Sequence, residues 1–455
     1  MNRKTATALV ICLALIAFSA LSFTLVKTLR TQVPVLGSYY PSGSEEEEET
    51  QTKAEKIKIN YQRLAYDLTQ SGGVGVSSLM LERAGAQTCA VLEEEVKGGE
   101  ISPDRFRQIT GYTPFAFADK YGTMVSRDMG DNGKETFTLG FTGDINFTET
   151  GYVMTHAYNM PGCVMDCIDE TFQNEMRSAD IMFINNEFPY SDRGTRQVDK
   201  KYTFRAKPEN VKYLNELGVD IVSLANNHTY DYGYESFVDT LETLRNADIL
   251  YVGAGMTASE ANAPVSLLIN GYKVSYIACS GVEYPVKTPV ATETSCGIMG
   301  SYDNGEKTKE AVEKAREDSD YVIVFPHWGF ENTTQLTSAQ ISNSRKWIDA
   351  GADAVIGCHA HILQGMDYYK GVPVAYGLGN FWFNTRDVYT VLYKLVVSGS
   401  GIEVRIVPGR QAHSETFYLE SESERRSLYN SIISWSPNNN ISISDEGIIT
   451  EKKDD

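Results

Sequence analysis

Side chains that bind metals or transfer protons follow five short apolar segments of this chain, and four of its six histidines are among them. Each segment is typical of a buried strand in a largely parallel sheet, whose polar end lies at the carboxyl edge. Imidazole, amide and carboxylate groups are all ligands of divalent metals. We therefore expect these side chains to meet at one site. They are Asp144, Asn146, Glu187, Asn227, His228, His327, His359 and His361.

Proton transfer is predicted for His228, which precedes Asp231 by three residues. The His228 ring could donate a proton to a leaving oxygen while Asp231 orients it, or it could merely cap the loop by hydrogen bonds. Arg205 is expected to pair with a phosphate or carboxylate of the substrate, with an exposed structural arginine as the alternative. Glu331 is expected either to hold the free ring nitrogen of His327 or to be solvated.

Strand and helix patterns alternate along the middle of the chain, which predicts a layered α/β domain over residues 136–410. The expected strands lie near 137–142, 180–184, 219–224, 249–253, 273–279, 320–325, 352–356 and 372–376, and the expected helices near 167–178, 208–217, 233–247, 305–316 and 337–350. Past Asn380 two apolar segments flank residues 398–401, which predicts a hairpin in a mixed or second sheet. The Ser-, Glu- and Asn-rich segment 411–455 is expected at the periphery.

The length of 455 residues favours more than one structural unit, because single cores seldom exceed ~250–300 residues. A hydrophobic content of 42% with 27 Tyr and 18 Phe is typical of a globular protein. The net charge of -19 argues against nucleic acid as a partner, since proteins that bind it cluster Lys and Arg to neutralise phosphates.

Residues 1–30 are predicted to form a membrane signal anchor. The uncharged, mostly apolar run 6–26 would be ~31 Å long as a helix, enough to cross the hydrocarbon core of a bilayer. It exceeds the ~7–15 apolar residues of a cleaved signal peptide, although the small residues Ala17, Ser19 and Ala20 leave cleavage open as the alternative. The long C-terminal part is expected to be exported, which would make the main domain extracytoplasmic.

Two segments separate the predicted anchor from the main domain. Residues 31–53 are predicted to form an acidic linker, in which like-charge repulsion along 45–49 favours an extended chain. Residues 54–130 carry short amphipathic patterns broken at glycine pairs, which predicts a small helical subdomain. It contains no identifiable chemistry, so we expect a spacer or a docking surface.

Six of the seven cysteines lie outside the apolar N-terminal run, and the sequence does not give their pairing. Cys163 and Cys167 are expected to form a local disulfide or to remain two free thiols, since no second Cys or His pair lies nearby at zinc-finger spacing. Cys358 is interpreted as a small buried residue, because its thiolate would crowd the flanking imidazole ligands.

Six short motifs occur in order along residues 137–410. They are Thr142-Gly143-Asp144, Asn186-Glu187-Phe188-Pro189, Leu224-Ala225-Asn226-Asn227-His228 with Asp231 and Gly233, His327-Trp328-Gly329 with Glu331, Gly357-Cys358-His359-Ala360-His361, and Gly377-Leu378-Gly379-Asn380-Phe381. Together they closely resemble the CapA-like family of poly-γ-glutamate capsule synthesis proteins, which is similar in turn to the calcineurin-like metallophosphoesterases. The resemblance implies a layered α/β/β/α sandwich with a two-metal cleft.

The resemblance also implies roles for individual residues. Asp144 and His361 would hold the first metal, Glu187 would bridge, and Asn227, His327 and His359 would hold the second. Mn, Zn or Fe is expected for such mixed imidazole and carboxylate ligands.

Two positions depart from the phosphoesterase pattern. That pattern usually has His where this chain has Asn146, and usually has Asp where this chain has Glu187. The lost imidazole should weaken or alter the first site, leaving Asn146 beside the ligands, and the longer Glu187 should shift the metal spacing. Asn380, in the last motif, is expected to contact substrate, with strand-end packing as an equal alternative.

Two classes of function are consistent with these features. In the first, the exported domain hydrolyses or transfers a phosphoester at the cell surface, or acts on an anionic polymer, through metal-activated water. In the second, it is a non-catalytic scaffold or polymer-binding component of a capsule synthesis complex, whose bound cations hold γ-linked glutamate. The expected partners are the membrane, an anionic polymer or phosphoester, and membrane-bound capsule synthesis subunits.

Overall fold

The structure is a computed structural model that describes residues 126–282 and 287–452. The predicted signal anchor, the acidic linker and residues 54–125 of the predicted helical subdomain lie outside the described residues. Within the described ranges, no helix is both long and apolar enough to cross a membrane. Residues 126–130, predicted to belong to the helical subdomain, form strand β1 (Ser126–Gly130), which pairs with the main domain through β7.

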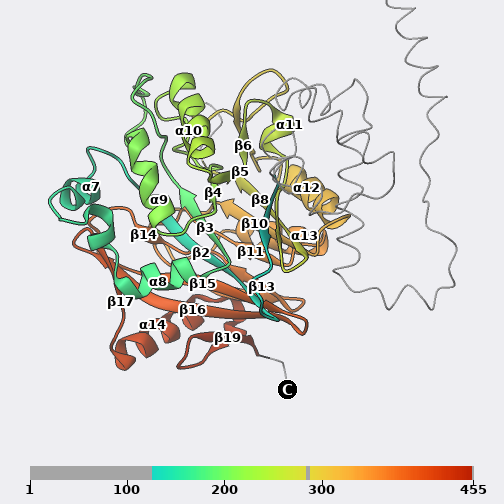
Figure 1. Cartoon of the computed structure of the whole chain (residues 1–455). Coiled ribbons are helices and arrows are strands. Elements are labelled where there is room, and N and C mark those ends of the chain that lie inside the picture. Colours follow the sequence, from blue (N-terminus) through green and yellow to red (C-terminus); the bar gives the residue numbers. More distant parts are fainter. Residues whose placement is uncertain (1–125, 283–286, 453–455) are drawn as a thin grey trace, which may run out of the picture. The chain divides into compact units, whose positions relative to one another are not determined.

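Two mixed sheets form the body of the described chain (Figure 1). The seven-stranded sheet has the order β1, β7 (Val265–Ile269), β8 (Tyr272–Ser280), β10 (Tyr321–His327), β11 (Ala354–Ile356), β13 (Val372–Ala375) and β12 (Met366–Tyr369). The ten-stranded sheet has the order β18 (Ile441–Ile443), β19 (Ile448–Glu451), β16 (Gly401–Ala412), β15 (Val388–Ser398), β2 (Phe137–Ile145), β3 (Ile181–Asn186), β4 (Ile221–Ser223) and β5 (Leu250–Val252), with β14 (Asn380–Trp382) beside β2 and β17 (Glu415–Tyr418) beside β16. A short pair joins β6 (Ala254–Gly255) to β9 (Gly297–Ile298).

Each sheet contains a run of parallel strands. Strands β2, β3, β4 and β5 are parallel in one sheet, and β8, β10, β11 and β13 are parallel in the other. The carboxyl ends of parallel strands share one edge of a sheet, where α/β proteins place their sites. The predicted hairpin at 391–407 is present as β15 and β16, which are antiparallel.

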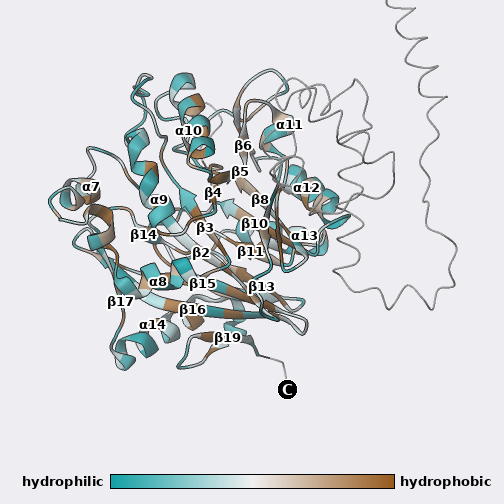
Figure 2. Ribbon diagram, viewed as in Figure 1, coloured by the Kyte–Doolittle hydropathy of each residue, from teal (hydrophilic) through white to brown (hydrophobic). Residues whose placement is uncertain are grey.

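The two sheets pack face to face through a shared apolar core. Phe141 and Phe183 from the ten-stranded sheet join Tyr276 and Phe325 from the seven-stranded sheet, and all four are buried. The ring of Phe183 stacks on Tyr276 at 5.4 Å between centroids and lies 4.6 Å from the ring of Phe325. Figure 2 shows apolar residues along the strands of both sheets.

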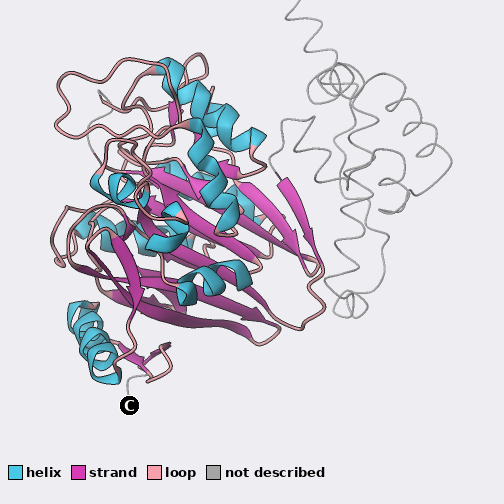
Figure 3. Ribbon diagram, turned by 60° about the vertical axis from the view of Figure 1, so that its left-hand side comes forward, coloured by secondary structure: helices cyan, strands magenta, loops and turns pink. Residues whose placement is uncertain are grey.

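Helices cover the outer faces of both sheets (Figure 3). Helices α8 (Glu170–Ser178), α9 (Lys212–Glu216) and α10 (Tyr234–Asn246) bury apolar residues against the ten-stranded sheet, and α12 (Glu306–Arg316) and α13 (Ser338–Asp349) do so against the seven-stranded sheet. The shorter helices are α7 (Tyr152–Ala157), α11 (Ala258–Ala261), η2 (Cys163–Cys167), η3 (Pro208–Val211) and η4 (Pro437–Asn439). The mixed α/β class predicted from the sequence is confirmed, with its layers in the order helix, sheet, sheet, helix.

Aspartates fix the register at the opposite, amino-terminal edge of the parallel strands. Each aspartate directly precedes the first residue of a strand, and its carboxylate accepts a hydrogen bond from a backbone N–H of the neighbouring strand. The pairs are Asp180 with Thr138 (2.8 Å), Asp220 with Met182 (2.8 Å), Asp320 with Lys273 (2.8 Å) and Asp353 with Val322 (2.7 Å). The same arrangement recurs in both sheets, where each of these strands begins opposite the third residue of its neighbour.

The segment after residue 410 differs from its predicted peripheral place. Strands β17, β18 and β19 extend the ten-stranded sheet, and α14 (Glu422–Trp435) inserts apolar side chains into the core between the sheets. Leu428 and Ile432 of this helix are fully buried. The Ser and Glu residues belong to the exposed face of the helix. The composition of the whole segment therefore did not indicate the short apolar face that enters the core.

Candidate metal centre

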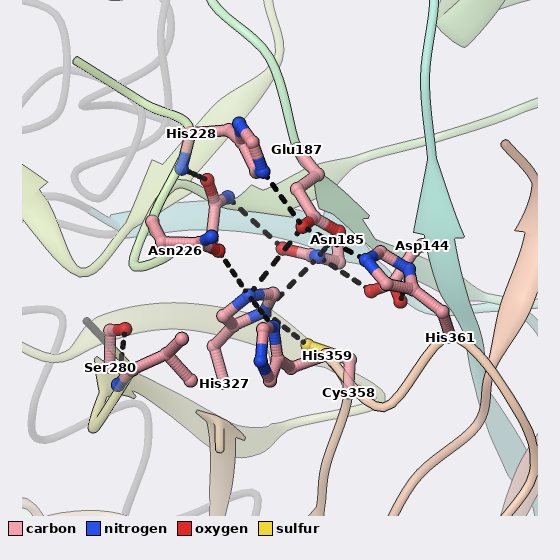
Figure 4. Close-up of polar contacts among 12 residues, drawn as sticks. Asp144, Asn185, Glu187, Asn226, His228, Ser280, His327, Cys358, His359 and His361 are labelled. Atoms are coloured by element: carbon pink, nitrogen blue, oxygen red, sulfur yellow. Dashed lines mark hydrogen bonds and ion pairs between the residues drawn. The ribbon is translucent and has the colours of Figure 1, made fainter. Parts of the chain in front are cut away.

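The side chains predicted to share one site come together where the strands of both sheets end (Figure 4). Asp144 lies at the end of β2 and Glu187 directly follows β3, whereas Asn227 and His228 lie in the loop after β4. From the other sheet, His327 ends β10, and His359 and His361 follow β11. The site therefore lies between the two sheets and draws on five strand ends.

Gly143 explains why a glycine precedes Asp144 in the first motif. A Cβ at this position would lie 1.9 Å from the carbonyl oxygen of Gly379, too close for any side chain. The same close approach lets the N–H of Asp144 donate to the carbonyl of Gly379 at 2.9 Å. The motif 377–381 thus packs on β2 and fixes the backbone that carries Asp144.

The residues that the resemblance assigned to a second metal surround one ring nitrogen of His327. Nε2 of His327 lies 2.8 Å from Oδ1 of Asn227, 3.0 Å from Nδ1 of His359 and 3.6 Å from Oε1 of Glu187. His327 and Glu187 are fully buried, and Asn227 and His359 nearly so. Four donor groups therefore converge on one small volume.

The residues assigned to a first metal also contact one another. Nδ1 of His361 lies 3.1 Å from Oδ2 of Asp144, and Nε2 of His361 lies 3.9 Å from Oε1 of Glu187. Asn380, predicted to contact substrate, has its Oδ1 2.8 Å from Nδ1 of His361. Asn146 is buried nearby, but its side-chain oxygen accepts the backbone N–H of Thr148 at 2.8 Å and closes a local turn.

Glu187 provides the test of whether a cation fits this cluster. Its Oε1 is buried and has no hydrogen-bond partner among the described residues. Three histidine Nε2 atoms stand around this oxygen, those of His327 at 3.6 Å and of His228 and His361 at 3.9 Å. Burial, and then the charge of Asp144, raise the pKa of Glu187 well above its ordinary value. In its ionised form a carboxylate buried in this setting needs a positive partner, and a divalent ion would supply one.

The imidazoles around Glu187 differ in their preferred protonation state. Burial lowers the pKa of His327 well below its ordinary value and that of His359 to about 3, so both rings are neutral donors, as metal ligation requires. Burial opposes the charged form of His361, but the hydrogen bond to Asp144, the charge of Asp144 and the hydrogen bond to Asn380 together raise the pKa of that ring. The contact with His361 lowers the pKa of Asp144 despite the opposing effect of burial.

The donor atoms also form two compact groups. Asp144, His327 and Cys358 make one, and Glu187, His359 and His361 make the other, with the ligand atoms of each group within 4.8 Å of one another. Five of these six residues are predicted ligands, divided differently from the resemblance, and the sixth, Cys358, was not predicted to be a ligand. Cys358 is buried, as predicted, and its Sγ lies 3.1 Å from Nδ1 of His327. Burial raises the pKa of this thiol well above its ordinary value, so it is neutral beside the imidazole.

His228 and Asp231 form the pair predicted from their spacing. Nδ1 of His228 lies 2.7 Å from Oδ2 of Asp231, and Nε2 of the same ring is directed toward Glu187. Burial lowers the pKa of His228, although Asp231 acts in the opposite direction. The ring of Phe204 packs on the His228 ring at 4.2 Å between centroids. His228 therefore has a fixed orientation, with one nitrogen held and the other facing the cluster.

Two roles were left open for each of Glu331 and Arg205. Glu331 is exposed, which agrees with the solvated alternative, and the Nδ1 atom of His327 contacts Cys358. Arg205 is held by the protein, with Nη2 3.3 Å from Oε1 of Glu149 and its guanidinium 4.3 Å from the centre of the Tyr232 ring. The five cysteines among the described residues, Cys163 and Cys167 included, are free thiols.

Three buried polar residues at the site were not predicted from the sequence. Nδ2 of Asn185 donates to Oδ1 of Asp144 at 2.8 Å and lies 3.2 Å from Oε2 of Glu187. Asn226 accepts the backbone N–H of His228 at 3.0 Å. The Nζ atom of Lys200 lies 2.9 Å from Oδ1 of Asp231. The paired asparagines 185–186 and 226–227 at strand ends were a usable signal, whereas lysine is seldom buried and Lys200 gave none.

Comparison with known proteins gives the family of this chain. The family model described as bacterial capsule synthesis protein PGA_cap matches residues 138–385, more than half of the sequence, and these residues include every predicted metal ligand. The chain belongs to this family of bacterial capsule synthesis proteins.

Named relatives carry related descriptions. The chain is 29% identical over 286 residues to the capsule biosynthesis protein CapA of Bacillus anthracis, covering 60% of this chain and 67% of that protein. It is 29% identical over 294 residues to the PGA biosynthesis protein CapA of Bacillus subtilis, covering 63% and 74%. A probable polyglutamine synthesis accessory protein of Mycobacterium tuberculosis is 25% identical over 279 residues, covering 55% and 73%.

Solved structures are more distant. The sulfate thiohydrolase SoxB of Thermus thermophilus superposes with a TM-score of 0.34 at 11% identity, covering 65% of this chain and 60% of that one. A score of this size does not establish a shared fold.

Proposed function

We propose that this protein acts in the synthesis or export of a poly-γ-glutamate capsule, as a membrane-anchored protein whose main domain is extracytoplasmic. Its membership of the capsule synthesis family and the names of its Bacillus relatives support this role. The proposed anchor rests on the apolar run 6–26. The partners are the anionic polymer and the membrane-bound subunits that make or export it.

We further propose that the buried cluster holds two divalent ions, of Mn, Zn or Fe. The observation that carries this proposal is the buried, unpartnered Oε1 of Glu187 among three imidazole nitrogens. When bound, such ions lower the pKa of water and polarise a phosphoryl or acyl oxygen. Asp144 and His361 would hold one ion, Asn227, His327 and His359 the other, and Glu187 would contact both.

The chain supplies its own proton-transfer group beside this cluster. Because Asp231 holds Nδ1 of His228, the free Nε2 atom is the one that exchanges a proton with the substrate. The fixed ring of His228 avoids the entropy cost of orienting it at each turnover. Asn380, whose Oδ1 lies 2.8 Å from Nδ1 of His361, would orient the His361 ring.

A non-catalytic role is favoured by one observation. His228, His359 and His361 are only 5%, 4% and 8% exposed, so the cluster is nearly closed to a large polymer. In this second candidate, a non-catalytic scaffold, the metal centre holds the domain in the shape that a capsule synthesis complex recognises. A third candidate, phosphoester hydrolysis on another cell-surface substrate, uses the same residues as the first.

Capsule yield in cells separates these candidates at matched protein levels. If the site is catalytic, His228→Ala and Glu187→Ala should both abolish capsule. If the site only holds metal, His228→Ala should leave the yield intact while Glu187→Ala abolishes it. His413→Ala, an exposed histidine outside the motifs, serves as the control. Normal capsule with Glu187→Ala would overturn the proposal that capsule output depends on the cluster.

A further inference from the structure

Lys200 is a buried lysine whose ammonium group contacts the loop that carries two site residues. Its side chain is 4% exposed, and Nζ lies 2.9 Å from Oδ1 of Asp231. The same Nζ donates to the backbone carbonyl of Asn227. Lysine is almost never this buried unless its charge is paired. The buried ammonium group of Lys200 therefore needs an anionic partner, and Asp231 is that partner.

Asp231 connects Lys200 to the predicted proton-transfer residue. The carboxylate is fully buried, and its second oxygen, Oδ2, accepts from Nδ1 of His228 and from the backbone N–H of Phe204, each at 2.7 Å. Lys200 and Phe204 flank this carboxylate from one short segment, and the Phe204 ring also packs on His228. Segment 200–204 therefore fastens onto the loop 227–231 at several points.

The contact to Asn227 reaches the metal cluster itself. The carbonyl of Asn227 accepts from Lys200 and from Oγ1 of Thr288 at 2.6 Å, so the Asn227 peptide is held from two sides. On the other side of this residue, Oδ1 lies 2.8 Å from Nε2 of His327. The direction of the peptide constrains where the side chain of Asn227 points.

We propose that Lys200 is a positioning residue, which sets the side-chain oxygen of Asn227 toward the metal cluster and, through Asp231, the ring of His228. This inference rests on the proposed metal function of the cluster. Buried ion pairs contribute little net stability, because desolvation offsets their attraction, and an apolar pair could fill the same volume. Geometry at the site is therefore the property that Lys200 supplies.

Metal affinity of the purified full-length protein tests the proposal, with Mn²⁺ titrated calorimetrically and the Co²⁺ absorption spectrum as a geometric readout. Lys200→Ala should weaken Mn²⁺ binding about 10–100-fold, the usual effect of removing a group that orients a ligand. Lys394→Ala is the matched control, since Lys394 is 14% exposed and pairs with Glu175 at 2.5 Å away from the cluster. Ethylammonium, which can refill the cavity and restore the charge, should recover binding in Lys200→Ala only.

A second variant keeps the proposal testable if Lys200→Ala fails to fold. Lys200→Ala leaves the Asp231 carboxylate buried without its cation, whereas Lys200→Met with Asp231→Asn removes both charges and leaves none uncompensated. The double variant should fold and still show weakened Mn²⁺ binding and an altered Co²⁺ spectrum. Wild-type affinity and spectrum in either folded variant would overturn the role of Lys200.

The outcome is distinguishable from failure of the proposed function. If the wild-type protein binds no Mn²⁺ or Co²⁺ at the cluster, the metal proposal fails and the role of Lys200 fails with it. If wild-type and Lys200 variants bind equally well, only the positioning role is contradicted. Loss of binding without recovery by ethylammonium would indicate a structural defect and would also contradict it.

Discussion

His359 and His361 adopt backbone φ angles of +100° and +57°, a region that residues with a Cβ rarely occupy. Each such conformation costs on the order of 1–3 kcal/mol and persists only where the surroundings enforce it. The enforced turn brings the rings of both histidines into the cluster, with the His359 ring 4.6 Å from that of His327. Strain at two donor positions is consistent with a site kept for ligation rather than for stability.

At the residue scale, the first prediction concerns His228. His228→Ala should leave the metal content near that of the wild type, because the ring is not among the assigned ligands. Turnover of any phosphodiester substrate found should fall on the order of 10²–10⁴-fold, the usual contribution of a positioned acid or base. Steady-state kinetics with a phosphodiester panel measure this. Unchanged turnover would remove His228 from the chemistry.

The donor residues could be predicted individually because each follows an apolar strand in the sequence. The groups that orient them could not. Asn185 contacts both carboxylates through one amide, and Lys200 reaches the site from a charged surface loop, contacts that only the tertiary fold creates. Two roles were left open for Glu331, and the sequence could not decide between them, because the contact of Nδ1 of His327 with Cys358 arises only in the tertiary fold.

At the scale of elements, the alternating pattern predicted most of the helices and strands that carry the site. The five expected helices overlap η3 with α9, and α8, α10, α12 and α13. The C-terminal segment was misjudged, since composition averages the two faces of α14 and the short strands β18 and β19 carry few residues each. This segment joins the core through its tertiary packing, which the local sequence pattern does not indicate.

Asp220 allows a test of the aspartates that fix strand register. Burial raises the pKa of Asp220 to about 6, although its hydrogen bond from Met182 acts in the opposite direction. Asp220 therefore holds its proton more tightly in the folded state than in the unfolded state, where its pKa is 3.8. Below its unfolded-state pKa, protonated Asp220 stabilises the folded state by about 3 kcal/mol. This contribution is lost as the pH rises through about 6.

Asp220→Asn should remove this pH dependence. Urea unfolding of the full-length protein at several pH values measures it, by comparing the variant with the wild type. The free energy of unfolding of the wild type should fall relative to that of Asp220→Asn as the pH rises across this range. Parallel pH profiles for the two proteins would contradict the shifted pKa.

Leu428 tests whether α14 belongs to the core. Its side chain is fully buried between the sheets, so Leu428→Ala should lower the free energy of unfolding by about 2–5 kcal/mol. Ser427→Ala, an exposed neighbour on the same helix, should change it by less than about 0.5 kcal/mol. Equal, small effects of both substitutions in thermal unfolding would mean that the helix is dispensable.

At the scale of the whole molecule, the proposed topology predicts where the main domain is found. The protein should stay in the membrane fraction, and protease added to intact cells or protoplasts should digest the main domain. A cytoplasmic protein of the same cells, followed in the same samples, reports any lysis. Full protection until lysis would place the domain on the cytoplasmic side of the membrane and would contradict the proposed topology.

The metal content of the purified full-length protein tests the central claim most directly, because both function classes depend on an occupied cluster. Elemental analysis should find about two divalent ions per wild-type chain. Glu187→Ala and His359→Ala should each lower that content, whereas His413→Ala should retain it. A wild-type protein without bound transition metal, or native metal content in both site variants, would contradict the assignment of these residues as ligands.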